Sequence, residues 1–163
     1  MELSPTQKGN IAEAAITAEA VRRGIDVLRP VVEGYRYDLV LDVGKRLLRV
    51  QCKWARLKGD VVVVHLATCR LTPRGYRRTT YGLTEVDLVA AYCEALHTCY
   101  ALPIAEVAGC SAVQLRLGPA KNNQAKRVRF AKDYEFGAIA QLGERRHGMA
   151  EVVGSSPTSS IAV

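Results

Sequence analysis

Residues 35–53, YRYDLVLDVGKRLLRVQCK, contain two stretches of alternating side chains separated by the two-residue loop Gly44-Lys45. A loop of this length with glycine first is typical of a tight type II′ β-hairpin, because glycine tolerates the positive φ that the turn requires. The turn fixes the register of the two strands and sets Asp38 directly opposite Gln51. The cross-strand neighbours of this hairpin can therefore be named before any other element is assigned.

Three polar side chains meet on one face of this hairpin. Side chains alternate along a strand, so Gln51 and Lys53 share a face, with Asp38 opposite Gln51 and diagonal to Lys53. The oxygens of Asp38 and Gln51 can then reach one hard cation such as Mg²⁺, while Lys53 orients a water molecule or stabilises developing negative charge. An ordinary solvent-facing hairpin with a polar row explains the same pattern, and the spacing leaves both interpretations open.

The chain has the size and composition of one globular domain. Its 163 residues, 48% hydrophobic and 24% charged, allow one core and leave little room for two. No run approaches the about 18 apolar residues of a membrane span, and the N-terminus lacks a secretory signal, so we expect a cytoplasmic protein without membrane contact. The five cysteines contain no C-x-x-C pair and indicate neither a disulfide framework nor a zinc site.

The first regular element is predicted to be a helix that begins near Ser4-Pro5 and ends at about Arg23, before Gly24. Apolar residues recur in it at helical spacing: Ile11, Ala15, Ala18 and Val21. Its alanine-rich middle lets it approach a sheet closely, which holds Glu13 near whatever the helix packs on. Taken alone, the pattern indicates that Glu13 is an exposed surface glutamate.

Several later stretches predict strands. Residues 25–32 predict a strand that lies at a sheet edge or ends early, because Pro30 has no N–H to donate. Residues 60–71 are β-branched and almost continuously apolar, which is typical of a strand buried on both faces, with His65 packed in the core. Residues 111–118 predict another strand.

Residues 84–104 fit two interpretations. Thr84 and Asp87 imitate the start of a helix, whereas residues 86–92 and 99–104 have the composition of two strands of a hairpin. The period of the apolar residues does not decide between them.

Basic residues dominate the charge of the chain, which is formally +7. This balance favours a polyanion partner, although a positive surface also serves solubility. Residues 71–84 combine arginines and tyrosines with turn-forming residues and predict a loop that contacts nucleic acid, and residues 121–136 predict a basic, partly helical segment. The candidate nucleic-acid-binding residues are Arg70, Arg74, Tyr76, Arg77, Arg78, Lys121, Lys126, Arg127 and Arg129.

Six segments follow one another in the order AEAAITAEAVRRGIDVLRP, YDLVLDVGKRLLRVQCKWA, TCRL, YGLTEVDLVAAYC, YALPIAEV and LRLGPAKNNQAKRVRFAKDYEF. Together they cover about residues 8–136 and resemble the group I intron-associated PD-(D/E)XK homing endonucleases. The resemblance implies an α/β (α+β) fold with a restriction-endonuclease-like core, a mixed β-sheet flanked by helices. It also implies hydrolysis of phosphodiester bonds in double-stranded DNA with a divalent metal, and a strand pair within residues 84–104.

The resemblance also implies roles for individual residues. Asp38 matches the aspartate of the first motif, Gln51 takes the place of the second acid, and Lys53 is the motif lysine. Glu13 matches the helix glutamate that accompanies this site, so it becomes a metal-proximal group and no longer a plain surface residue. The chain departs from the motif at Tyr37, where the motif has proline, and at Gln51. The implied catalytic set is Glu13, Asp38, Gln51 and Lys53, with Asp38 and Gln51 holding Mg²⁺.

The number of chains in the assembly and the biological role of the nuclease are further expectations, and the role has two alternatives. A homing enzyme reads a long site, which so small a chain can do only with several copies of its basic surface, so we expect a homodimer or homotetramer. A restriction or repair nuclease of the same superfamily would keep the fold. A catalytically silent nucleic-acid-binding protein, such as an intron-splicing helper, is the other alternative. The joint presence of Glu13, Asp38 and Lys53 speaks against it.

Residues 137–163 lack the apolar pattern of the preceding chain, so we predict a nuclease domain at 1–136 and a flexible tail at 137–163. The segments AQLGER and VGSSPTSS in this tail resemble a transfer-RNA gene read as protein. Our hypothesis is that the reading frame enters a neighbouring transfer-RNA gene, whose nucleotide sequence would fold as a cloverleaf. A natural extension rich in Gly and Ser is the alternative.

Overall fold

Helix α1 (Pro5–Arg22) opens the chain in the computed structural model, which describes residues 2–32, 34–119 and 128–139. The helix begins with a reciprocal cap. The Ser4 hydroxyl accepts a hydrogen bond of 3.2 Å from the backbone N–H of Gln7, and the Gln7 side chain accepts one of 2.8 Å from the backbone N–H of Ser4. The predicted first helix is confirmed, including its end before Gly24.

The buried face of α1 is formed by Ala12, Ile16 and Ala20, which recur every four residues. Ala18 and Val21, which belong to the apolar spacing noted in the sequence, are exposed. The small residues of the buried face let the helix lie close to the sheet, because small side chains add little to the distance between helix axis and strands.

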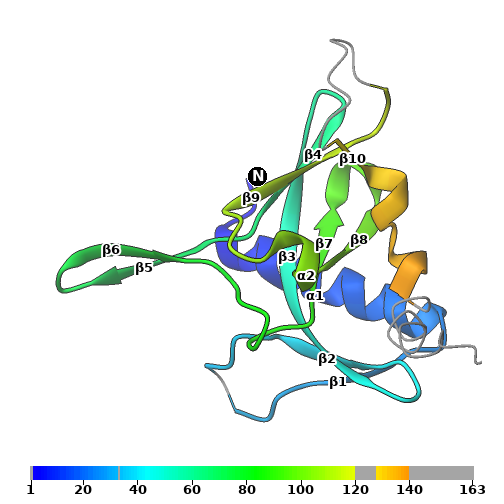
Figure 1. Cartoon of the computed structure of the whole chain (residues 1–163), viewed down its shortest axis with the longest axis horizontal. Coiled ribbons are helices and arrows are strands. Elements are labelled where there is room, and N and C mark those ends of the chain that lie inside the picture. Colours follow the sequence, from blue (N-terminus) through cyan, green and yellow to red (C-terminus); the bar gives the residue numbers. More distant parts are fainter. Residues whose placement is uncertain (1, 33, 120–127, 140–163) are drawn as a thin grey trace, which may run out of the picture.

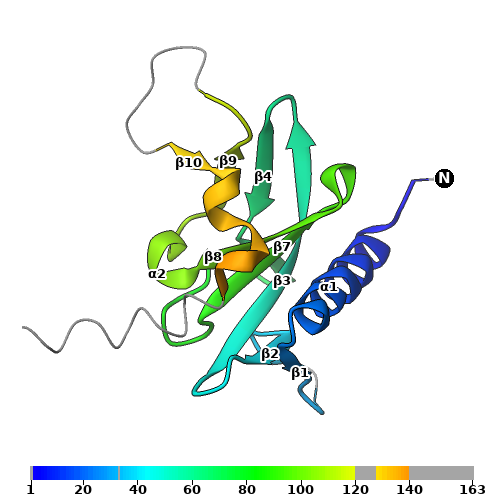
Figure 2. The ribbon, with the colours of Figure 1, turned by 90° about the vertical axis from the view of Figure 1, so that its right-hand side faces the viewer.

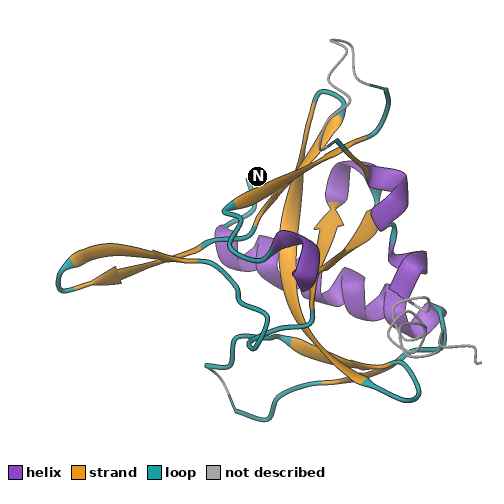
Figure 3. Cartoon of the chain, in the orientation of Figure 1, coloured by secondary structure: helices purple, strands orange, loops and turns teal. Residues whose placement is uncertain are grey.

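Eight strands form one mixed sheet in the order β1-β2-β3-β4-β9-β10, with β7 paired to β3 and β8 paired to β7 (Figures 1 and 3). The strands are β1 (Asp26–Leu28), β2 (Leu39–Asp42), β3 (Leu47–Lys58), β4 (Val61–His65), β7 (Leu88–Cys93), β8 (Thr98–Pro103), β9 (Ala112–Arg116) and β10 (Arg129–Phe130). The predicted edge strand β1, the strand β9 and the strand pair β7–β8 are confirmed. The alternative of a helix in residues 84–104 is wrong.

Strand β3 changes its neighbour along one edge. Its first part pairs with β2, where Leu39 lies opposite Val50, and its last part pairs with β4, where Ala55 lies opposite Val64. The other edge pairs in parallel with β7 from Val50 to Ala55. β2 and β4 therefore diverge from the same edge of β3, and residues 51–54 lie at the fork between them (Figure 2).

A hydrophobic core lies on each face of this sheet. Along β7, Leu88 and Ala90 belong to the core under α1, whereas Val89 and Ala91 belong to the core on the opposite face. The second core is covered by the short helix α2 (Ile104–Val107) and the 3₁₀ turn η2 (Ala131–Tyr134) (Figure 2). This arrangement makes β7 a strand buried on both faces.

Strands β5 (Thr68–Thr72) and β6 (Gly75–Thr79) form a separate two-stranded ribbon that projects from the body (Figure 1). Two predictions are wrong here. The strand expected over residues 60–71 is divided between β4 and β5, and its His65 is exposed instead of packed in the core. The loop expected over residues 71–84 largely forms the second half of the ribbon. The chain turns between Thr72 and Gly75, and the residues on either side of this turn pair as antiparallel strands.

The C-terminal part of the described chain contains the 3₁₀ turns η1 (Glu94–Leu96), η2 and η3 (Phe136–Ala138). Phe136 and Ile139 are buried against the α1 side of the core, so the packed body reaches past the boundary predicted at residue 136. The tail from residue 140 and the transfer-RNA hypothesis lie outside the described residues. Within the described ranges, no helix has the length and apolar character needed to cross a membrane.

Candidate active site

Asp38 lies just before β2 and is tied to the middle of β3. Its backbone N–H donates to the Val50 carbonyl (2.9 Å), although Val50 is the register partner of Leu39, so the regular pairing ends at Leu39 and Asp38 lies just outside it. Its carboxylate oxygen Oδ2 accepts hydrogen bonds from the backbone N–H of Cys52 (2.7 Å) and from the Gln51 side-chain amide. The register predicted from the Gly44-Lys45 turn is confirmed for residues 39–42 against 47–50, and Gly44 has the positive φ of 88° that this turn requires. The predicted direct pair of Asp38 with Gln51 is not part of this backbone ladder; the two residues meet through their side chains.

Glu13 and Asp38 line one cavity of about 330 Å³, which is also lined by Arg29 and by the connection between β1 and β2. Glu13 is half-buried, and its Oε2 accepts a hydrogen bond of 3.4 Å from the Arg29 guanidinium. Burial raises the pKa of Glu13, and the negative charge of Asp38 raises it further. Burial also raises the pKa of Asp38, against the lowering effects of the Cys52 hydrogen bond and the Lys53 charge. Two carboxylates therefore share a partly desolvated space.

Lys53 completes the group on the same face of β3 as Gln51. Its ammonium donates a hydrogen bond of 2.9 Å to the hydroxyl of Tyr81. Burial lowers the pKa of Lys53, while the nearby charge of Asp38 acts to raise it. The fork between β2 and β4 thus brings an acid, an amide and a lysine together at residues 38, 51 and 53.

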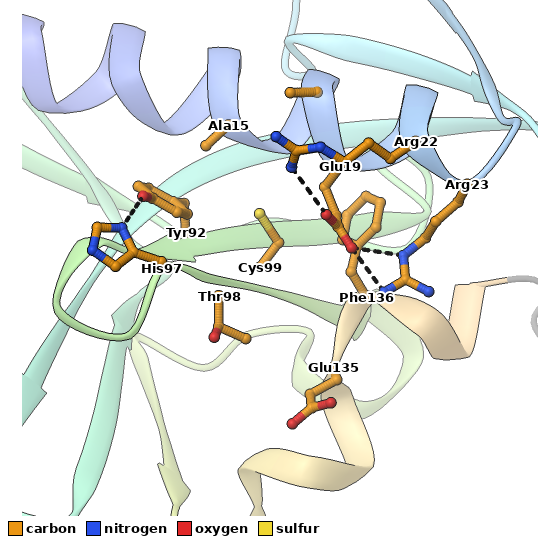
Figure 4. A pocket seen from close by; sticks show the side chains of 11 residues that line it. Ala15, Glu19, Arg22, Arg23, Tyr92, His97, Thr98, Cys99, Glu135 and Phe136 are labelled. Atoms are coloured by element: carbon orange, nitrogen blue, oxygen red, sulfur yellow. Dashed lines mark hydrogen bonds and ion pairs between the residues drawn. The ribbon is translucent and has the colours of Figure 1, made fainter.

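A second cavity, of about 400 Å³, lies between α1 and the β7–β8 hairpin (Figure 4). Glu19 occupies its wall and forms ion pairs with Arg22 (3.5 Å) and Arg23 (2.7 Å), and the Tyr92 hydroxyl lies 3.4 Å from Nδ1 of His97. The residues that line this cavity are all different from those around Asp38. Glu19, Arg22 and Arg23 of this cavity pair with one another, and the residues of the sequence motif lie elsewhere, so the candidate site is the cavity at Asp38.

The family model of the PD-(D/E)XK endonucleases matches residues 3–137. The chain belongs to the PD-(D/E)XK endonuclease family. No curated protein matches the chain. Among solved structures, it is similar to the bacterial homing endonuclease I-Ssp6803I, with 28% identity and a TM-score of 0.69 over 90% of this chain and 100% of that one.

This PD-(D/E)XK endonuclease therefore has the restriction-endonuclease-like fold that the sequence predicts, and the predicted family is confirmed. It is a DNA endonuclease, a hydrolase of phosphodiester bonds. PD-(D/E)XK nucleases use divalent metal ions. Such ions bind oxygen ligands, which the carboxylates of Glu13 and Asp38 provide in the cavity.

The residues at Asp38 fit a divalent cation of the Mg²⁺ type. The N–H groups of Gln51 and Cys52 both donate to Oδ2, and among the described residues Oδ1 accepts no hydrogen bond, so this oxygen can face a ligand. Mg²⁺ is held in nuclease-like sites by one or two carboxylates together with waters and phosphates, so a pair such as Asp38 and Glu13 suffices. No cluster of three or more His, Cys, Asp or Glu able to hold a metal occurs in the described ranges.

Gln51 presents its amide nitrogen, and not its oxygen, to Asp38. The same nitrogen lies 3.3 Å from the Cys52 carbonyl. An amide oxygen would bind the cation beside Asp38 only after the side-chain amide turns over, an orientation that is set by the hydrogen-bond network. Gln51 therefore acts in this state as a donor that holds the Asp38 carboxylate.

The predicted nucleic-acid-binding residues fall into three groups. Arg74, Tyr76, Arg77 and Arg78 are exposed on the ribbon, and Arg70 belongs to its strand β5. Arg129 lies in β10, on the other side of the body in Figure 1, and its guanidinium donates to the Glu106 carbonyl (3.0 Å). The remaining three, Lys121, Lys126 and Arg127, lie outside the described residues.

Three residues near the site were missed from the sequence. Arg29 reaches Glu13 from the end of β1, and no pattern in residues 25–32 marks it. Tyr81 was grouped with the nucleic-acid-stacking residues of the loop 71–84, but its side chain is only 3% exposed and contacts Lys53. Arg36, two residues before Asp38, lies over the Tyr81 ring at 4.4 Å. Only long-range packing brings these residues to the site.

Proposed function

We propose that this chain is a metal-dependent, site-specific homing endonuclease that cuts double-stranded DNA and is encoded within a group I intron. The observation that carries the proposal is the placement of Asp38, Gln51 and Lys53 at the fork of β3, with Glu13 in the same cavity. The similarity of the fold to that of a bacterial homing endonuclease, over 90% of this chain, supports the same proposal.

We assign Mg²⁺ to Asp38 and Glu13, with Gln51 as a further ligand once its amide turns over. When bound, the ion supplies Lewis-acid stabilisation of the negative charge that builds up on the phosphate. Asp38 is held rigidly for this purpose, because two donors from β3 fix Oδ2. The Lys53 ammonium orients the attacking water or stabilises charge on the phosphate oxygens.

The ribbon β5–β6 is the proposed DNA-reading element. A two-stranded ribbon fits the major groove of DNA, which is about 12 Å wide. Arg70 pairs across the ribbon with Arg77, and Tyr76 at the tip is 79% exposed. The exposed Arg77 and Arg78 of β6 can bind phosphates or guanine edges, while Tyr76 offers an apolar contact. The net charge of +7 gives the long-range attraction to DNA.

A homodimer or homotetramer follows from the length of a homing site, because one ribbon spans only part of it. Sedimentation velocity of the free protein and of its complex with DNA measures the number of chains. A single chain per DNA molecule would contradict this part of the proposal.

The deciding experiment incubates the protein with DNA that carries candidate transfer-RNA genes, in Mg²⁺ or in EDTA. Lys53→Ala is compared with Lys58→Ala, which removes an exposed lysine at the end of the same strand. We expect specific cuts that need Mg²⁺, persist in Lys58→Ala and disappear in Lys53→Ala. Equal cutting by all three proteins would point to a contaminating nuclease and refute the assignment. Cuts at short sites scattered over the DNA would favour a restriction nuclease instead.

A further inference from the structure

Tyr81 is a buried tyrosine whose hydroxyl meets the ammonium of Lys53. Its side chain is 3% exposed and belongs to the core on the face opposite α1. Lys53 donates to the Tyr81 hydroxyl at 2.9 Å, and its Nζ lies 5.0 Å from the centre of the Tyr81 ring. A phenylalanine would fill a core position equally well. A buried tyrosine hydroxyl therefore needs a hydrogen-bond partner. That partner is Lys53.

Arg36 also contacts the Tyr81 ring. Its guanidinium lies 4.4 Å from the ring centre and donates 2.9 Å hydrogen bonds to the carboxylate of Glu85 and to the carbonyl of Thr80. It also lies 3.4 Å from the hydroxyl of Thr68. Glu85 is held in turn by the backbone N–H of Gly82 (2.8 Å). Arg36, Thr80 and Glu85 therefore form a hydrogen-bonded frame around the Tyr81 ring.

This frame connects the base of the ribbon to the candidate active site. Thr68 is the first residue of β5, and Thr80 directly follows β6, so Arg36 holds both ends of the ribbon together. Tyr81 follows Thr80 in the chain and reaches Lys53 on β3. The contacts run without interruption from the ribbon through Arg36 and Tyr81 to the lysine.

We propose that Tyr81 is a positioning residue that fixes the ammonium of Lys53 beside Asp38, and that Arg36 locks Tyr81 to the base of the ribbon. A lysine side chain has four rotatable bonds, and a bonded partner for its ammonium narrows the set of rotamers that it adopts. The Tyr81 hydroxyl supplies that limit. The inference rests on the proposed function, because it assumes that Lys53 acts in the chemical step.

The test compares Tyr81→Phe with Tyr134→Phe. The first keeps the ring that Arg36 and Lys53 contact and removes only the hydroxyl. The second removes a hydroxyl bonded to Glu106 at 2.7 Å, away from Asp38, and so controls for the loss of one tyrosine hydrogen bond. Three quantities are measured: the single-turnover cleavage rate in Mg²⁺, the Kd for target DNA in EDTA, and Tm.

Tyr81→Phe is expected to cut about 10-fold to 100-fold more slowly, the usual effect of removing a partner that orients an active-site group. Its Kd should match that of the parent, and its Tm should fall no more than that of Tyr134→Phe. A purely structural role would lower DNA affinity and Tm together with the rate. A joint loss of this kind would overturn the inference.

Lys53→Ala separates this inference from the proposed function. If Lys53→Ala is inactive and Tyr81→Phe cuts at the parent rate, the positioning role of Tyr81 is wrong and the function stands. If Lys53→Ala cuts like the parent, the role of Lys53 in the proposed function fails. A measurement on the parent protein does not depend on how a variant folds. The ¹⁵N NMR signal of the Lys53 ammonium should be sharp, because the Tyr81 hydroxyl holds it, whereas the signal of exposed Lys58 should be broad. An equally broad Lys53 signal would contradict the inference.

Discussion

The backbone N–H of Cys52 donates a hydrogen bond of 2.7 Å to Oδ2 of Asp38. The acidic residue of the candidate site is thereby fixed to the strand that carries Gln51 and Lys53 on either side of Cys52. Because the donor is a backbone group, the contact depends on strand register and not on the side chain at position 52. The geometry of the site is therefore a property of the β2–β3 pair.

Asp38→Asn should abolish cleavage while leaving the fold intact. Asparagine can still accept the Cys52 N–H, but it lacks the charge that holds a divalent cation. We expect the single-turnover rate to fall about 100-fold or more, equivalent to about 3 kcal/mol of transition-state stabilisation. Asp42→Asn, at the far end of the adjoining strand β2, is the control and should cut normally, because the bond of 2.9 Å that the Asp42 carboxylate accepts from the Gly44 N–H is local to the turn. Full activity of Asp38→Asn would remove Asp38 from the site.

Gln51→Glu should change the metal requirement without preventing folding. The substitution removes the amide donor to Asp38 and places two carboxylates together, so metal-free protein loses stability through repulsion and binds Mg²⁺ more tightly. The Mg²⁺ concentration for half-maximal cleavage and Tm with and without Mg²⁺ are the measurements. Gln114→Glu, exposed on β9, is the control. An unchanged Mg²⁺ dependence would count against Gln51 as a ligand.

Arg77→Ala should weaken DNA binding and leave stability unchanged, because Arg77 is exposed on the ribbon. If the arginine contacts a phosphate, the slope of log K against log salt falls by about 1 and all DNA sequences lose affinity alike. If it contacts a base edge, target DNA loses more affinity than random DNA. Fluorescence anisotropy at several salt concentrations separates these cases. Arg56→Ala, exposed on β3, is the control, and equal behaviour of the two variants would refute a role for the ribbon.

Asp87→Asn should make stability less dependent on pH. Burial acts to raise the pKa of Asp87, but hydrogen bonds from the side chain and backbone of Arg49 outweigh it and leave the pKa below the ordinary aspartate value. A carboxylate with a lowered pKa stabilises the fold above its unfolded-state pKa, and this contribution is lost as pH falls through the folded-state pKa.

Urea unfolding at pH 7 and in acid measures this effect. Asp87→Asn should cost about 1 kcal/mol of unfolding free energy at pH 7, the range for a partly exposed charged hydrogen bond, and less in acid. Asp26→Asn replaces an exposed carboxylate on β1 and serves as control. A constant difference between Asp87→Asn and the parent at all pH values would show that the lost contact is not electrostatic.

Local sequence information was enough to predict the hairpin and its pairing. The length and glycine of the Gly44-Lys45 turn set the register of residues 39–42 against 47–50, and Asp38, just beyond this ladder, contacts the side chain of Gln51. The cap at Ser4 and the spacing in residues 5–22 likewise placed α1. Such features depend on contacts between residues close in the chain, which a local pattern can encode. The strand pair in residues 84–104 needed the family resemblance as well.

Tertiary structure alone decided which distant residues complete the site. The fork of β3, the end of β4 at exposed His65 and the ribbon at residues 68–79 all depend on which strands pair across long loops. Tyr81 became a partner of Lys53, and Arg29 a partner of Glu13, only through this packing. The pairing of distant segments is set by loop-closure entropy and by the fit of the whole core, and neither leaves a periodic signal in the sequence.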